Sequence, residues 1–170
     1  MSDLNVAVVG ATGLVGREFL RILEHWTVPI KSLSLYASDR SAGTLLPFRG
    51  GELRVEETSD DSFKSIDIAL FSAGADVSER FSPVAARSGA VVVDNSSAFR
   101  MDPDAPLVIP EVNPNDLEKH QGIIANPNCS TIQMLVALYP LHQINPIKRI
   151  IVSTYQAVAG TGTAAVDELN

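Results

Sequence analysis

A glycine pattern, G-x-x-G-x-x-G, constrains the fold of this 170-residue chain more than any other feature. The letters GATGLVG at 10–16 follow the apolar run 4–9 and precede apolar residues at helical spacing up to Trp26. A strand, a tight turn and an amphipathic helix are therefore predicted, and a β-like run at 33–37 would complete a βαβ unit. Glycines there let backbone N–H groups approach a pyrophosphate at the helix N-terminus. A turn that is merely rich in glycine is the alternative interpretation.

The remaining chain alternates apolar runs with helical patterns. Strands are predicted near Leu53 and Val55 (after a loop at 38–51) and at 66–71, 91–93, 107–109, 123–125 and 149–158. One helix is expected after 72–74, with Pro83 either kinking it or opening it behind Ser82, another up to Pro140, and a last one from about Thr163. This alternation predicts an α/β fold, a Rossmann-type doubly wound, mostly parallel sheet.

Small and polar residues follow five of the predicted strands directly. These segments are 10–16, 38–41, 72–74, 95–100 and 126–129. Because ligands of open α/β sheets bind beyond the carboxyl ends of the strands, one edge of the sheet is expected to gather all five.

The charge balance and the cysteine count limit the classes of partner. With 13 basic and 20 acidic residues the net charge is −7, which argues against nucleic acid or an anionic membrane and favours a small molecule or a protein. One cysteine and three histidines give no disulfide and no zinc spacing. Neither a signal peptide nor an apolar run long enough to span a membrane is evident, so a cytoplasmic, metal-free protein is expected.

Residues 38–41, SDRS, would meet the adenosine ribose of a dinucleotide. An acidic residue such as Asp39 accepts from a ribose 2′-hydroxyl, whereas an arginine with nearby hydroxyls holds a 2′-phosphate. Local chemistry leaves NAD and NADP open, and Arg40 favours NADP unless it pairs with Asp39.

Cys129 lies between a predicted turn and a predicted helix, so its thiol would sit at a helix N-terminus that stabilises a thiolate. The alternative is a small buried apolar residue. Arg100 could bind a carboxylate or phosphate, or pair with Asp102 or Asp104. Gln156, in an apolar stretch, could orient a substrate or satisfy backbone groups. His25, His120 and His142 are expected at the surface, and none is an obvious general base.

The chain resembles the nucleotide-binding part of the aspartate-β-semialdehyde dehydrogenase family. The matching blocks run from residue 4 to about 165 in the expected order: VAVVGATGLVG, SLYASDRSAG, LFSAG, VVVDNSSAFRMD, LVIPEVNP, IIANPNCSTIQM and STYQAVAGTG. The resemblance implies an NADP-binding domain at 1–130 and the start of a catalytic and dimerisation domain at 131–170.

The resemblance also implies a role for each site residue. Cys129 would be the acyl-thioester nucleophile, with Arg100, Asn128 and Gln156 binding substrate and phosphate. The cofactor would contact Gly10, Thr12, Gly13, Leu14 and Val15 near its pyrophosphate, Ser38, Arg40 and Ser41 near its 2′-phosphate, Ser72, Ala73 and Gly74 near its middle, and Ala159 and Gly160 near the nicotinamide.

The implied reaction is the NADP-dependent interconversion of aspartyl phosphate and aspartate semialdehyde through a cysteine thioester, in lysine (diaminopimelate), threonine and methionine biosynthesis. The family's catalytic histidine lies beyond residue 170, so we expect a truncated chain that binds cofactor but turns over poorly, the full-length form being a homodimer. An N-acetyl-glutamyl-phosphate reductase and a noncatalytic nucleotide-binding module are the alternatives.

Overall fold

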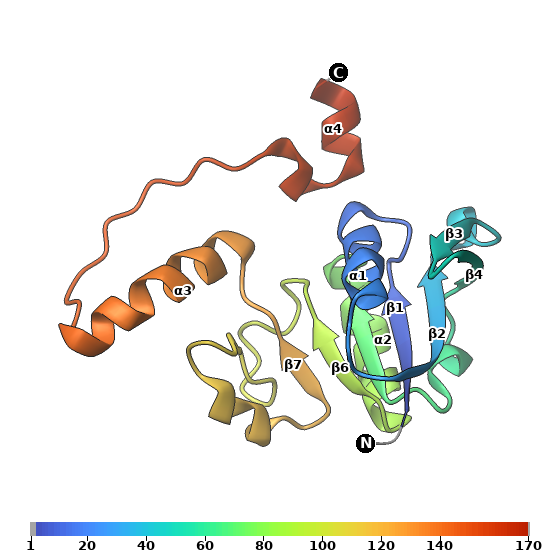
Figure 1. Ribbon diagram of the computed structural model, residues 1–170, viewed down its shortest axis with the longest axis horizontal. Coiled ribbons are helices and arrows are strands. Elements are labelled where there is room, and N and C mark those ends of the chain that lie inside the picture. Colours follow the sequence, from blue (N-terminus) through green and yellow to red (C-terminus); the bar gives the residue numbers. More distant parts are fainter. Residues whose placement is uncertain (1–2, 170) are drawn as a thin grey trace.

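The computed structural model describes residues 3–169, and in them seven strands form one sheet (Figure 1). The order across the sheet is β3-β4-β2-β1-β5-β6-β7, and only β3 runs antiparallel to its neighbour. The strands are β1 (Leu4–Val9), β2 (Ile30–Ala37), β3 (Leu45–Phe48), β4 (Gly51–Glu57), β5 (Ile68–Phe71), β6 (Val91–Asp94) and β7 (Ile123–Ala125). The predicted Rossmann-type, mostly parallel sheet is confirmed.

Two helices cover opposite faces of this sheet, because successive side chains of a strand point to opposite sides. Val8 of β1 packs in one core cluster with Leu20 of α1, and Val9 packs in the other with Phe81 of α2. The helices are α1 (Leu14–Glu24), α2 (Ala75–Arg87), α3 (Cys129–Ile144) and α4 (Thr163–Leu169), and the short 3₁₀ segments are η1 (Asp39–Ser41), η2 (Asp60–Phe63), η3 (Pro114–Lys119) and η4 (Val158–Thr161). Among the described residues, none of the helices is both long and apolar enough to cross a bilayer.

The chain changes direction beside β1, which pairs with β2 on one side and with β5 on the other. The turns after β1 and β5 therefore diverge at the carboxyl edge and leave a crevice there, the position where α/β sheets bind ligands. After α3, which projects away from the sheet, residues 145–157 run back over this edge to η4 and α4 (Figure 1).

The predicted loop at 38–51 contains a strand, so that part of the prediction was wrong. β3 pairs with β4 through a tight turn at Arg49 and Gly50, which both have positive φ, at 48° and 79°. Turns of this kind match the twist of paired strands, but they are usually signalled by Asn-Gly or Asp-Gly and not by Arg-Gly. Leu46 in β3 is buried against the core.

Of the two alternatives for Pro83, the one that opens the helix there is wrong, and the helix end predicted at Pro140 came too early. Pro83 lies inside α2 and not at its first position, and α3 continues through Pro140 to Ile144. In α2, Phe81 and Ala85 pack on the sheet on either side of the proline, so tertiary contacts outweigh the missing N–H.

Two predicted strands do not form as strands. Residues 107–109 make only one isolated bridge, between Leu107 and Ala125 of β7. Residues 149–158 hold no strand, and 149–157 are exposed, because no other described segment runs alongside to complete their hydrogen bonds.

Candidate functional site

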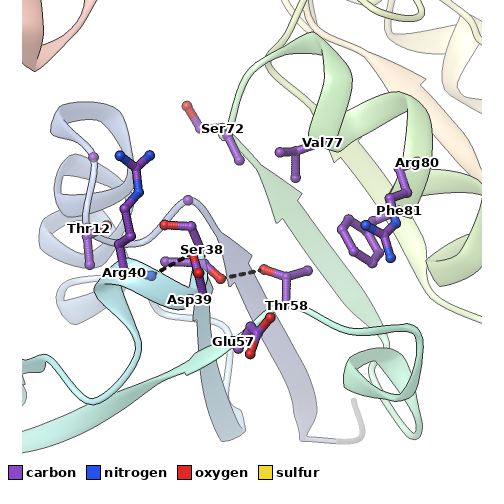
Figure 2. Close-up of a pocket in the computed structure, with 14 residues that line it drawn as sticks. Thr12, Ser38, Asp39, Arg40, Glu57, Thr58, Ser72, Val77, Arg80 and Phe81 are labelled. Carbon is purple, nitrogen blue, oxygen red and sulfur yellow. Dashed lines mark hydrogen bonds between the residues drawn. The ribbon is translucent and has the colours of Figure 1, made fainter.

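A cavity of about 570 Å³ opens at the carboxyl edge of the sheet (Figure 2). It lies between the glycine turn and η1 on one side and the start of α2 on the other. The lining residues are Gly10, Thr12, Gly13, Ala37, Ser38, Asp39, Arg40, Glu57, Thr58, Ser72, Ala73, Val77, Arg80 and Phe81. Seven of the predicted cofactor residues are thus brought together here.

The glycine turn owes its shape to two close backbone approaches. Gly10 has a φ of 86°, and its N–H donates to the carbonyl of Tyr36 at 2.8 Å. A Cβ at Gly10 would overlap the Ser72 carbonyl, and a Cβ at Gly16 would overlap the Gly10 carbonyl. Only glycines allow β1, β5 and α1 to meet this closely, which leaves the turn's backbone open toward the cavity.

Asp39 and Arg40 do not form an ion pair. The Asp39 carboxylate accepts the backbone N–H of Arg40 at 2.8 Å. The exposed Arg40 guanidinium makes no salt bridge within residues 3–169, and Figure 2 shows its side chain extending beside Thr12 on one side of the cavity. The hydroxyl of Ser41 lies 3.3 Å from that of Thr12, which ties η1 to the glycine turn although Ser41 itself lines neither cavity.

A second cavity, of about 340 Å³, continues along the same edge. Its lining brings the glycine turn, the turns after β5 and β6, and the returning C-terminal segment together: Gly13, Leu14, Val15, Ser72, Gly74, Asn95, Ser96, Ala159, Gly160 and Gly162. Leu14 and Val15 are about two-fifths exposed, so they present apolar surface to it. The two cavities share Gly13 and Ser72 and therefore form a continuous crevice.

Cys129 is the first residue of α3, and its thiol is exposed. Asn128 caps this helix, because its side-chain oxygen accepts the N–H of Ser130 at 3.0 Å. The amide nitrogen of Gln156 lies 3.6 Å from the Cys129 sulfur, although 27 residues separate them. A Cβ at Gly160 would overlap the Gln156 amide, so Gly160 leaves room for this contact.

Arg100 is held by backbone carbonyls and not by Asp102 or Asp104. Its Nε donates to the carbonyl of Asn126 at 3.0 Å, and a terminal nitrogen donates to the carbonyl of Asn95 at 3.2 Å. No salt bridge to Arg100 occurs in the described part of the chain. The side chains of Asn95 and Asn126 are themselves joined at 2.6 Å, which links the second cavity to the turn before Cys129.

Besides Ser41, four predicted site residues line neither cavity: Arg100, Asn128, Cys129 and Gln156. The histidines do not line them either, as far as residues 3–169 are described. Sequence reasoning missed Glu57 and Thr58, although their position at the carboxyl end of β4 was a usable signal. It also missed Val77, Arg80 and Phe81. The α2 residues carry no local signal, because only the packed helix brings them to the cavity.

Comparison with known proteins matches residues 5–120 to a family described as "Semialdehyde dehydrogenase, NAD binding domain". Among similar proteins, the aspartate-semialdehyde dehydrogenase of Aquifex aeolicus is 58% identical over 167 residues, which cover 96% of this chain and 49% of that protein. The chain thus spans about half the length of the relatives it matches.

Solved structures of similar proteins resemble this fold as well. Aspartate semialdehyde dehydrogenase II of Vibrio cholerae, complexed with ASA, has a TM-score of 0.95 at 48% identity and covers 99% of this chain with 51% of its own. The Candida albicans enzyme with NADP has a TM-score of 0.74 at 28% identity, over 86% of this chain and 48% of that one.

Proposed function

Since the chain belongs to the semialdehyde dehydrogenase family, we propose that it is the cofactor-binding and nucleophile-bearing half of an NADP-dependent aspartate-semialdehyde dehydrogenase. The observation that carries this proposal is the exposed Cys129 thiol, which meets the Gln156 amide beside the crevice. The NADP in the Candida structure and the ASA in the Vibrio structure support the choice of cofactor and substrate.

The crevice fits a dinucleotide in size and chemistry. The larger cavity takes the adenosine end, with Arg40 and Ser41 at the 2′-phosphate and Ser38 at the ribose. Gly10, Thr12, Gly13, Leu14 and Val15 take the pyrophosphate at the N-terminus of α1. Ser72, Ala73 and Gly74 hold the middle, and Ala159 and Gly160 flank the nicotinamide in the second cavity. The bound cofactor supplies a two-electron acceptor or donor of hydride.

Arg40 distinguishes the two cofactors in this proposal. The Asp39 carboxylate accepts the backbone N–H of Arg40 and makes no ion pair with the Arg40 guanidinium. The guanidinium has no carboxylate partner among the described residues and can take a 2′-phosphate in a bidentate manner.

Cys129 carries the acyl group. Its thiolate adds to the aldehyde carbon of aspartate semialdehyde, and after oxidation the acyl group remains on the sulfur as a thioester. Inorganic phosphate then attacks the thioester carbonyl, forms aspartyl phosphate and releases the thiolate. Biosynthesis runs the same steps in reverse, and the thioester divides one difficult reduction into two easier ones.

Arg100, Asn128 and Gln156 position the groups that react. Arg100 supplies a fixed positive charge for the phosphate or the substrate carboxylate. Asn128 fixes the first turn of α3, and Gln156 orients the substrate against the sulfur.

The remaining parts of the proposal concern the whole protein. Residues 1–130 form the NADP-binding domain, and 131–170 begin a catalytic and dimerisation domain. The general base is a histidine outside these 170 residues. Its absence alone lowers the turnover rate of the isolated chain about 10²–10⁴-fold relative to the whole protein. The whole protein acts as a cytoplasmic homodimer in lysine, threonine and methionine biosynthesis.

Steady-state assay of the whole protein tests this proposal. NADP⁺ reduction should require both aspartate semialdehyde and phosphate, and Cys129→Ala should lower kcat on the order of 10³-fold or more while cofactor binding stays unchanged. Full activity in Cys129→Ala, or use of N-acetylglutamate semialdehyde with no response to aspartate semialdehyde, would contradict it.

A further inference from the structure

Asp94, the last residue of β6, is a fully buried carboxylate that no role assigned above uses. One of its oxygens accepts the Ser78 hydroxyl at 2.7 Å and the Ser96 N–H at 3.1 Å, and the other accepts the Ser96 hydroxyl at 2.7 Å. Its donors therefore come from α2 on one side and from the turn after β6 on the other.

A buried charge is tolerated only where donors surround it. Asp94 makes no ion pair with any residue the structure describes, so the three neutral donors must compensate for its lost hydration. Such a group resists displacement. Moving Ser96 would leave one oxygen without a partner, and moving Ser78 would remove one of the two donors to the other oxygen. The hydroxyl of Ser96 also accepts the N–H of Ala98 at 3.1 Å, which extends the constraint along the turn.

This constrained turn is the one that holds Arg100. The carbonyl of Asn95, next to Asp94, accepts from the Arg100 guanidinium, and the carbonyl of Asp94 accepts the N–H of Asn126 at 2.8 Å. Asn126 in turn offers the second carbonyl to Arg100. Both residues whose carbonyls hold Arg100 are therefore linked to Asp94. Asn95 follows it in the chain, and Asn126 is joined to it by one backbone hydrogen bond.

We propose that Asp94 is a positioning residue that locks the 95–100 turn onto α2 and thereby points the Arg100 charge toward the substrate site beside Cys129. This inference rests on the role of Arg100 in the proposed function and adds the group that sets its direction. Asp94 touches neither cavity, so it acts only through the turn.

The test compares how fast iodoacetate, an anion, and iodoacetamide, which is neutral, alkylate Cys129 in the 170-residue chain. The ratio of the two rate constants reports the positive charge near the sulfur, and an ionic strength of about 10 mM keeps screening weak. Arg100→Gln should lower this ratio roughly two- to tenfold. Ser96→Ala, which changes no charge, should lower it most of the way to the Arg100→Gln value.

Asp94→Ala gives a directional test. Removing the negative charge of Asp94 should by itself raise the ratio of the two rate constants, whereas displacement of the Arg100 guanidinium should lower it. We expect the ratio to fall in Asp94→Ala. Ser82→Ala is the matched control. Ser82 is as buried as Ser78 and lies one turn further along α2, but its hydroxyl has no hydrogen-bond partner among the described residues. A general loosening of the fold would raise both rates together and leave the ratio unchanged.

The outcomes separate this inference from the proposed function. A fall with Arg100→Gln but none with Ser96→Ala and Asp94→Ala overturns the positioning role alone. No fall with Arg100→Gln overturns both this inference and the anion-binding role of Arg100. If Asp94→Ala does not fold, the Ser96→Ala ratio decides.

Discussion

Single residues at the carboxyl edge owe their proposed roles to their backbone partners. The Asp39 carboxylate accepts a backbone N–H of its own turn and not the Arg40 guanidinium. Two carbonyls hold Arg100, and no acidic side chain within residues 3–169 forms a salt bridge with it. Three arginines lie at this edge although the chain as a whole is acidic: Arg40 and Arg80 line the larger cavity, and Arg100 is bound to the turns after β6 and β7. The distribution of charge, and not its sum, therefore determines which ligand the edge accepts.

Gly16→Ala should destabilise the chain strongly. The new Cβ would overlap the backbone of Gly10 and Ala11, which no side-chain rotation can relieve. We expect a loss of about 1–3 kcal/mol or more, measured as a lower midpoint of urea unfolding. Gly51→Ala is the control, because a Cβ there meets only the Phe48 carbonyl, at 3.8 Å. Equal midpoints for the two variants would refute the close approach.

Tyr36 should make the stability of the fold depend on pH in the alkaline range. Burial raises the pKa of Tyr36 in the folded state, although the hydroxyl donates to the Ser62 carbonyl at 2.8 Å. Tyr36 therefore ionises at a lower pH in the unfolded chain than in the folded one. Its contribution to the free energy of unfolding is complete below about pH 10 and declines as the pH rises toward the higher folded pKa. The stability advantage of the wild type over Tyr36→Phe should thus shrink above pH 10. A difference that stays constant from pH 8 to pH 11 would be inconsistent with a raised pKa.

At the scale of elements, the first turn of α3 depends on its cap. Asn128→Ala removes the acceptor for the Ser130 N–H and should cost about 1 kcal/mol, so amides of this turn should exchange with solvent about fivefold faster. Asn128→Ser, which retains a capping oxygen, should exchange almost as the wild type does. Unchanged exchange in Asn128→Ala would mean that the cap does not hold the helix.

Sequence patterns predict well those elements whose whole hydrophobic pattern lies within the element itself. The βαβ opening and the strands at β5, β6 and β7 follow from apolar runs ended by small residues. The predictions failed where distant contacts decide the outcome. Pro83 stays helical because Phe81 and Ala85 pack on the sheet, and residues 149–158 hold no strand because no described strand lies beside them.

The candidate site divides in the same way. The five turns were predictable because parallel strands end at one edge. Four of them line the two cavities, and the fifth, 126–129, is joined to them through Asn95 and Arg100. The lining by Val77, Arg80 and Phe81 could not be predicted, because their helix has to be docked first. The proximity of Gln156 to Cys129 likewise depends on the path of residues 145–157 and on no local pattern.

At the scale of the whole molecule, the sheet gathers segments from all along the chain into one crevice. Its larger end carries Arg40, and its smaller end is closed by 159–162, next to the segment that meets Cys129. A dinucleotide bound along this crevice would connect the two ends. Cofactor binding is thus the property on which the proposed chemistry depends.

Titration of the 170-residue chain with NADPH, followed by the cofactor's fluorescence, tests this most directly. Saturable binding is expected, tighter for NADPH than for NADH, and Arg40→Gln should remove the preference while leaving NADH binding unchanged. A fluorescence that does not change up to about millimolar NADPH, a concentration well above the Kd expected of a cofactor site, would contradict the crevice as a dinucleotide site.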